Sequence, residues 1–278
     1  MEFNFLESLL FGLFSGLTDI LPVSAQAHKA MMLTLFGVDT EPAILRLLIH
    51  AATIGALYFC SKKQIFRIYR QLKLARIPKK RRKRPVDMKL ILDYRMMQTM
   101  LIPLVLGCCL YGKTAKMQHS ISWAALFMLF NAVILFLPHL LPSGNKDSRS
   151  MTRVESLLMG AGGALGILPG ISSMGVMTAV ASVCGAERTY ALNISLMMNM
   201  FVNAVLVVFD ILAIASAGLS GLTFGVLVSY LVAAIIAFVA VCIAVRFLRN
   251  MVQHRGYSVF AWYSLAMAFL MFILYLMV

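Results

Sequence analysis

Long apolar blocks run through almost the whole chain, and they constrain its fold more than any other feature. An α-helix needs about 20 apolar residues to cross the hydrocarbon core of a bilayer. Apolar residues make up 61% of the chain and charged residues 13%, whereas a soluble domain has about 45–50% and about 25%. The sequence therefore predicts an all-α polytopic membrane protein. Its apolar blocks lie at about 3–36, 42–60, 96–111, 121–141, 154–184, 190–217, 222–245 and 259–278.

Proline and glycine break two of these eight blocks. The first block is broken at Pro22, just before a polar cluster at residues 24–29, and the fifth at Pro169, within a glycine-rich stretch. Backbone polar groups in lipid must be satisfied internally, so a break is tolerated only where protein or a water-filled cavity surrounds it. We therefore expect six spanning helices and two re-entrant helical hairpins, one at each break.

The chain contains an internal repeat. The segment Glu7–Gly12 (ESLLFG) recurs as Glu155–Gly160 (ESLLMG). The tripeptide Ile-Leu-Pro ends at both Pro22 and Pro169, and a serine follows each proline within three residues. Two matches in the same order and at nearly the same spacing indicate a duplication, and three spans in each unit predict an inverted repeat. The predicted units are a first repeat at 1–142, a linker at 143–153 and a second repeat at 154–278.

Basic residues are concentrated in one loop. The formal net charge is +14, and residues 62–89 hold thirteen of the twenty-five Lys and Arg residues with one acid. The positive-inside bias places this loop, the linker at 143–153 and the segment 246–255 in the cytoplasm, with both termini outside. Anionic inner-leaflet lipids are the expected partner of the loop. No globular module accompanies the basic run, so nucleic-acid binding is not expected. Within the loop, the apolar spacing over 62–77 suits either an interfacial helix or a solvated helical segment.

The two broken blocks also supply the polar groups that are capable of chemistry. Ionisable groups at membrane depth are costly and usually face a cavity, and the N–H groups at a helix start favour anions. We therefore expect the breaks to meet in a polar pocket for a phosphorylated or carboxylated ligand. The candidate residues are Asp19, Ser24, His28 and Lys29 at the first break and Gly170, Ser172 and Ser173 at the second.

Each candidate also has a purely structural interpretation. Asp19 and Ser24 suit helix caps, and Lys29 suits a side chain that snorkels to the interface. His28 suits a neutral, hydrogen-bonded interior histidine. Arg46 lies one helical turn from a second histidine, His50, and the two can line one water-exposed face of the same helix. These alternatives remain open at the level of sequence, and Asp210 is expected to be an interface charge.

The motifs around the two breaks resemble those of a known family. Residues 16–28 (GLTDILPVSAQAH) resemble the first signature of the bacterial undecaprenyl-diphosphate phosphatases of the bacitracin-resistance type, roughly E-G-[LI]-T-E-F-L-P-[VI]-S-S-[TS]-G-H. Residues 169–177 resemble the second signature, P-G-x-S-R-S-x-x-T, and the shorter stretches 48–53 and 191–195 are similar to further family elements. The resemblance implies six spans with two re-entrant hairpins, a plasma-membrane location and a role in recycling the lipid carrier of cell-wall synthesis.

The resemblance also implies roles for individual residues. In that family, acidic residues and a Ser/His of the first motif act with an arginine of the second to remove the terminal phosphate of undecaprenyl diphosphate, assisted by a divalent cation. The implied catalytic residues here are Asp19, Ser24 and His28, with Asp19 as ligand to Mg²⁺ or Ca²⁺. The implied phosphate-binding residues are Gly170, Ser172 and Ser173, joined by two cations that the family pattern does not contain, Lys29 and Arg46.

This chain departs from the signatures at three reactive positions. The leading Glu is replaced by Ser15, the second serine of the first motif by Ala25, and the arginine of the second motif by Ser173. Arginine binds phosphate oxygens bidentately and offsets charge during phosphoryl transfer. Two functions therefore remain open: an active phosphatase with a rebuilt site, and a non-catalytic relative that binds a polyprenyl (di)phosphate and translocates it, which suits inverted repeats. A homodimer is also left open.

Overall fold

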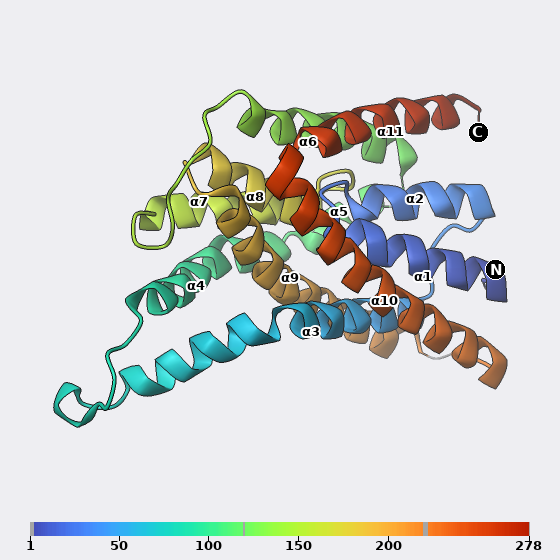
Figure 1. The fold of residues 1–278 in the computed structure, drawn as a ribbon. Coiled ribbons are helices and arrows are strands. Elements are labelled where there is room, and N and C mark those ends of the chain that lie inside the picture. The colour runs from blue at the N-terminus through green and yellow to red at the C-terminus, as the bar shows by residue number, and fades with distance from the viewer. Residues whose placement is uncertain (1–2, 119, 219–221, 278) are drawn as a thin grey trace.

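The structure is a computed structural model, and it describes residues 3–118, 120–218 and 222–277 (Figure 1). These residues form helices joined by short loops, with no strand among them beyond a single bridge between Lys146 and Ala186. The α-helices are α1 (Phe5–Ile20), α2 (Ala25–Phe36), α3 (Ala43–Ala75), α4 (Met88–Cys108), α5 (Tyr111–Gln118), α6 (Ile121–Phe136), α7 (Arg153–Ala164), α8 (Ser173–Val183), α9 (Arg188–Ala217), α10 (Phe224–Arg255) and α11 (Ser258–Met277). Three short 3-10 helices are η1 (Lys79–Arg81), η2 (Leu137–His139) and η3 (Leu165–Ile167).

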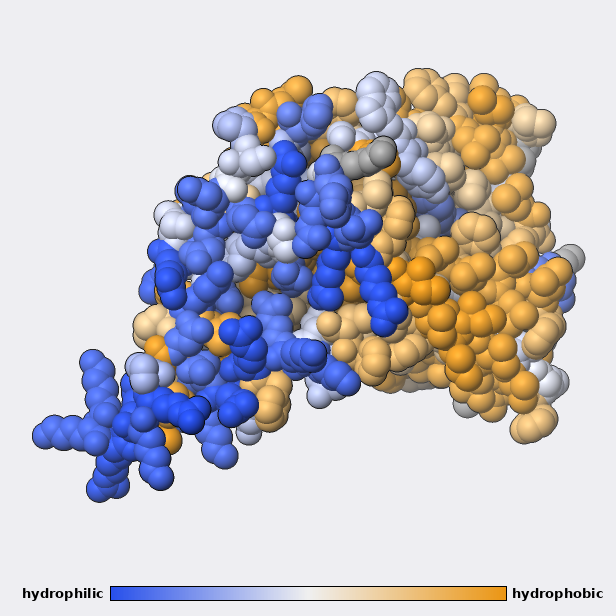
Figure 2. Space-filling model, viewed as in Figure 1, coloured by the Kyte–Doolittle hydropathy of each residue, from blue (hydrophilic) through white to orange (hydrophobic). Residues whose placement is uncertain are grey.

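Six helices in the described part of the chain are long and apolar enough to cross a membrane. They are α3, α4, α6 with η2, α9, α10 and α11. Figure 2 shows apolar side chains over the right-hand part of the molecule and hydrophilic side chains gathered at its left end. The predicted all-α, multi-pass membrane fold with six spanning helices is therefore confirmed.

The three basic segments lie toward one end of the molecule, which we call the basic end. Figure 1 shows the α3–α4 loop and the α6–α7 linker at the left, while both termini lie at the right. Ser148 Oγ donates to Lys89 O (3.1 Å) and so joins the linker to the loop. The linker is also bound to the start of α9 by Glu187 N to Lys146 O (3.0 Å), and Tyr257, just beyond the third segment, donates to Arg188 O there (3.1 Å). This arrangement agrees with the predicted grouping of the basic loops, and their cytoplasmic side stays a prediction.

Helix α3 differs from the sequence expectation. It runs unbroken through 33 residues, a length of about 50 Å that exceeds the roughly 30 Å of a hydrocarbon core. Most of the basic segment 62–77 is therefore the end of a spanning helix, where an independent interfacial or loop helix was expected. The reason is local, because no glycine or proline interrupts the chain between Gly55 and Pro78.

The two copies of the ESLL motif have the same local structure. Both begin a short helix with a capping box, formed by Asn4 and Glu7 at α1 and by Thr152 and Glu155 at α7. In each box the cap side chain accepts the N–H of the glutamate, and the glutamate accepts the N–H of the cap residue, so two end donors are satisfied. The equivalence supports the predicted duplication, while the inverted repeat as a whole stays a prediction.

The two breaks turn the chain back after α1 and after η3. Figure 1 shows α1 and α2 side by side at the end with the termini, and α7 with α8 toward the basic end. Ser24 caps α2 at a φ of 61°, and Ser172 caps α8, each accepting an N–H of the first turn. Gly170 has a φ of 100°, which L side chains rarely adopt, and its α-carbon faces the backbone of α6. Re-entry of these pairs into a bilayer stays a prediction.

The breaks are in direct contact, as the repeat predicts. The N–H of Gly170 donates to Ser24 Oγ (3.1 Å). Asn131 of α6 joins the two breaks, because its Nδ2 donates to Pro22 O (3.1 Å) and its Oδ1 accepts from the N–H of Ser172 (3.0 Å). Asn131 is fully buried, so this side chain satisfies backbone groups that water cannot reach.

Small residues bring α1 close to α10. A Cβ on Gly12 would collide with the backbone of Ala233, and one on Gly16 would collide with the backbone of Ala237. Close approach through small residues is a common way for membrane helices to pack. The contact fixes α1, and with it the acidic residue in its last turn.

Candidate functional site

A polar cavity of about 50 Å³ lies where the breaks meet the spanning helices. One water needs roughly 10–15 Å³ of such space, so the cavity has room for about four waters, or for the oxygens of one phosphate group. Its polar lining comes from α1, α2, α3, α8 and α9: Thr18, Asp19, Gln26, Lys29, His50, Ser172, Ser173 and Asn199.

Lys29 supplies the positive charge of this cavity. It lies on α2, is only 4% exposed, and its Nζ is 3.4 Å from His50 Nε2. A buried ammonium needs compensating partners. The lysine therefore lies inside the protein and faces the cavity, which differs from a side chain that snorkels to an interface.

A line of polar groups continues from Lys29 through α3 to α9. His50 Nδ1 donates to Asp210 Oδ2 (2.7 Å), which leaves the Nε2 lone pair to accept from Lys29. Asp210 also pairs with Arg46 Nε, and Arg46 Nη1 lies 3.7 Å from Glu41 Oε1. The carboxylate thus fixes the imidazole, and the imidazole in turn orients the ammonium.

This line changes two of the expectations. Arg46 does not line the cavity, because its guanidinium is paired with Asp210 and Glu41. Asp210 is 2% exposed and lies inside the protein, where an interface charge was expected. The sequence carries no local signal for this pairing, since Asp210 and His50 are 160 residues apart.

Asp19 is held by two asparagines that the sequence analysis missed. Asn203 Nδ2 donates to Asp19 Oδ2 (3.0 Å), and Asn199 Nδ2 donates to Asp19 O (3.2 Å). The asparagines are one turn apart on α9, and both are buried. Their i, i+4 spacing within a mostly apolar helix was the available signal, because buried polar groups in membranes are usually paired. Asp19 is therefore fixed in the last turn of α1 with its carboxylate at the cavity.

The start of α8 presents backbone donors to the cavity. The N–H groups of Ser173 and Met174 have no acceptor among the described residues, and both residues line the cavity. Ser172 Oγ accepts the N–H of Gly175 (3.1 Å), while Ser173 Oγ donates to Gly163 O (2.7 Å). A helix start with free N–H groups is a ready anion site. The N–H of Gly170, in contrast, is already bound to Ser24.

Ser24 and His28 lie beside the cavity but outside its lining. His28 Nδ1 donates to Ser24 O (2.8 Å), and its Nε2 accepts from the hydroxyl of Tyr263 (2.8 Å). The ring also stacks on Tyr263, with centroids 5.7 Å apart and planes at 10°. Both ring nitrogens are thus engaged, so of the three predicted catalytic residues only Asp19 reaches the cavity.

The cavity offers few ligands for a divalent cation. Among the described residues no three His, Cys, Asp or Glu side chains come close enough to hold a metal ion. Among the described residues of the lining, Asp19 is the one carboxylate, and one of its oxygens already accepts from Asn203. Mg²⁺ is often bound by one or two carboxylates together with substrate phosphates and water. The donor set therefore fits a cation shared with a bound diphosphate and does not fit an all-protein metal site.

Comparison with known proteins gives one consistent result. Residues 8–270 match the model of the family described as bacitracin resistance protein BacA. The relatives include proteins named undecaprenyl-diphosphatase in Methanobrevibacter smithii (25% identical, covering 97% of both chains) and Thermosipho africanus (26%, covering 96% of this chain and 99% of the relative). The undecaprenyl-diphosphatase 1 of Shouchella clausii is 25% identical and covers 97% of this chain and 96% of its own.

Proposed function

Because the chain belongs to the BacA family of bacitracin resistance proteins, we propose that its polar cavity binds the phosphate end of a polyprenyl (di)phosphate carrier lipid. The chain is a multi-pass membrane protein, and in bacteria the membrane concerned is the inner membrane. The proposed role is in the recycling of the lipid carrier for cell-wall synthesis, which is the setting of the family and of its bacitracin resistance.

One observation carries the proposal. A buried lysine and the free N–H groups at the start of α8 line the same cavity, and the two come from opposite halves of the sequence. Phosphate oxygens are favoured both by a cation and by helix-start N–H groups. In this arrangement Lys29 neutralises one charge of the phosphate, Ser173 and Met174 donate through their backbone, and Ser172 supplies a hydroxyl.

A divalent cation fits this proposal as a group shared between protein and lipid. Asp19 is the residue that would hold it, with the remaining ligands from the diphosphate and water. When bound, such a cation would neutralise phosphate charge and favour departure of the terminal phosphate. The chain itself contributes the fixed carboxylate and the asparagines that orient it.

Binding with little or no hydrolysis is the form of the proposal that the lining favours. Ala25 has no nucleophilic group, Ser173 has no guanidinium, and both nitrogens of His28 are engaged elsewhere. Lys29 supplies charge, but a point charge lacks the bidentate fork of arginine. An active phosphatase remains the second candidate, because Asp19 is retained at the cavity in a fixed orientation.

The test compares binding with turnover in the purified chain. We expect undecaprenyl phosphate to bind to the wild type, and Lys29→Gln to weaken that binding at least about tenfold, since charge-assisted contacts contribute roughly 1.5–3 kcal/mol. The matched control is Lys63→Gln, which removes the same charge from an exposed site in the basic part of α3. Equal loss in both variants would contradict the assignment of the phosphate to the cavity.

Phosphate release from undecaprenyl diphosphate, with and without Mg²⁺ or Ca²⁺, separates the two candidates. Release that Asp19→Asn abolishes would establish the phosphatase and overturn the non-hydrolytic form of the proposal. Binding without release supports it. If neither lipid binds, both candidates are wrong.

A further inference from the structure

A second and much larger hollow lies at the basic end, between α4 and α7. Its volume is about 620 Å³, and the α6–α7 linker forms one wall. We call it the α4–α7 groove. Its lining includes Arg95, Thr99 and Ile102 of α4, Ser148 of the linker, and Arg153 and Leu157 of α7. None of these residues lines the polar cavity.

Two arginines give the groove an unneutralised positive charge. Arg95 and Arg153 are exposed, and neither guanidinium has an ion-pair partner among the described residues. The acidic side chains around the groove are already engaged. They are Asp147 with Lys89 (3.3 Å), Glu155 with Lys146 (2.7 Å) and Asp93 with the hydroxyl of Tyr190 (3.0 Å).

The groove changes from charged to apolar along its length. One face of α4 carries Arg95, Thr99 and Ile102, at positions i, i+4 and i+7. The α-carbon of Ile102 therefore lies about 10 Å further along the helix axis from the basic end than that of Arg95. On α7, Leu157 follows Arg153 by one turn. Ile102 is 58% exposed and Leu157 39%, so the described protein leaves both apolar side chains uncovered.

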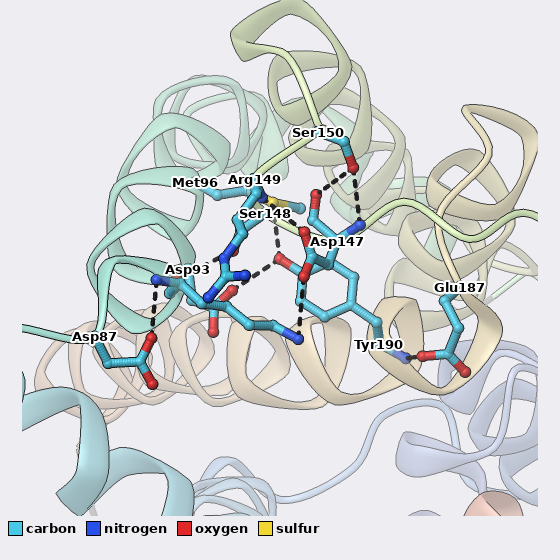
Figure 3. A network of polar contacts seen from close by, with 10 residues as sticks. Asp87, Asp93, Met96, Asp147, Ser148, Arg149, Ser150, Glu187 and Tyr190 are labelled. Atoms are coloured by element: carbon cyan, nitrogen blue, oxygen red, sulfur yellow. Dashed lines mark hydrogen bonds and ion pairs between the residues drawn. The ribbon is translucent and has the colours of Figure 1, made fainter.

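A polar network holds the linker wall of the groove in place. Figure 3 shows Asp93, Ser148, Asp147 and Tyr190 converging between α4, the linker and α9. Tyr190 Oη donates to Asp93 Oδ1 (3.0 Å), and Ser148 Oγ donates to the carbonyl at the start of α4 (3.1 Å). The linker wall is therefore bound to α4 through Ser148, beside a buried bond between α9 and α4, so the groove is formed without a ligand.

We propose that the α4–α7 groove binds an anionic phospholipid, with the headgroup phosphate between Arg95 and Arg153 and an acyl chain beside Ile102 and Leu157. The charge and the polarity gradient both favour this occupant, because guanidinium groups bind phosphate bidentately and basic pockets between membrane helices bind anionic headgroups. The site is separate from the polar cavity and does not depend on the function proposed for it. It also differs from a diffuse attraction of lipids to the loop at 62–89, because it places the headgroup and the acyl chain of one lipid beside defined residues.

The test is lipid titration of the whole chain in detergent, with retained lipids counted by native mass spectrometry. The probe is palmitoyl-oleoyl phosphatidylglycerol, and phosphatidylcholine is the zwitterionic comparison. We expect Arg95→Gln with Arg153→Gln to raise the Kd of the first bound phosphatidylglycerol at least about tenfold. The matched pair Arg81→Gln with Arg84→Gln removes the same charge from the exposed loop and should change this Kd less than about twofold.

A second pair of variants distinguishes a lipid from free phosphate. Ile102→Ser should weaken phosphatidylglycerol binding, whereas Ile235→Ser on the exposed face of α10 should not. Inorganic phosphate in excess should fail to displace the lipid. Equal effects of both arginine pairs, equal binding of phosphatidylcholine, or full displacement by inorganic phosphate would each overturn the proposal.

Discussion

Replacing Asn131 by leucine should separate the two helix breaks at a measurable cost in stability. Asn131 makes three buried hydrogen bonds: Nδ2 to Pro22 O (3.1 Å), Nδ2 to Ser264 Oγ (3.1 Å) and Oδ1 from the N–H of Ser172 (3.0 Å). Leucine has the same number of side-chain heavy atoms and the same branching at Cγ, so the substitution creates no empty space and leaves the partners unpaired.

The magnitude follows from the number of bonds. Hydrogen bonds between membrane helices contribute about 0.6 kcal/mol on average and up to about 1.7 kcal/mol. Three of them give an expected loss of about 2–5 kcal/mol in the free energy of unfolding. The upper part of this range is favoured, because Pro22 and Ser172 are buried and their backbone groups lose these bonds to Asn131.

The assay is equilibrium unfolding of the purified protein in mixed micelles, followed by circular dichroism. Asn250→Leu is the matched control, since Asn250 is exposed on α10, and it should change the free energy of unfolding by less than about 0.5 kcal/mol. A change of similar size for Asn131→Leu would refute the reasoning that this side chain joins the breaks.

Three further predictions concern single positions. Gly170→Ala should lower the melting temperature more than Gly218→Ala, because both have positive φ but only Gly170 faces backbone that a Cβ would strike; equal shifts would contradict this. Asp210→Ala should destabilise the protein by about 3–5 kcal/mol in chemical unfolding, since it removes the buried carboxylate that both His50 and Arg46 contact; a change under about 1 kcal/mol would argue against the importance of these contacts. The N–H of Arg149 and the nearby lysine hold the pKa of Asp147 below its ordinary value of 3.8. The linker should therefore keep this stabilisation above that value and lose it as pH falls through the lowered pKa, and in a melting series Asp147→Asn should remove that pH dependence.

Much of the fold follows from the sequence because the bilayer limits the alternatives. Apolar blocks of spanning length have to form helices, so the helices were predictable wherever a block was unbroken. Pro22 and Pro169 located the two breaks, and the repeated ESLL motif indicated that the two breaks play equivalent roles. The length of α3 was less predictable, because the apolar spacing of its basic end also suits a separate helix, and only the absence of glycine and proline favours one continuous helix.

The location of the site was predictable from the sequence, but the set of residues that form it was less so. The breaks supplied Asp19, Lys29 and the start of α8, and these do line one cavity. The partners that orient them come from distant segments, such as Asn203, 184 residues from Asp19. The direction of His28 depends on Tyr263, 235 residues away. The direction in which a side chain on a short helix points depends on such tertiary neighbours, and no local sequence pattern predicts it.

The packing of α1 and α2 has a consequence for biogenesis. This hairpin precedes every spanning helix during synthesis, yet its partners are α10 through Gly12 and Gly16, α9 through Asn203, and α11 through the stacked ring of Tyr263. During synthesis the nascent hairpin therefore has Lys29 without His50 until α3 is made, and Asp19 without Asn203 until α9 is made. The contacts of α1 with α10 and of His28 with Tyr263 form last, so the hairpin reaches its final packing only after the last helix has been translated.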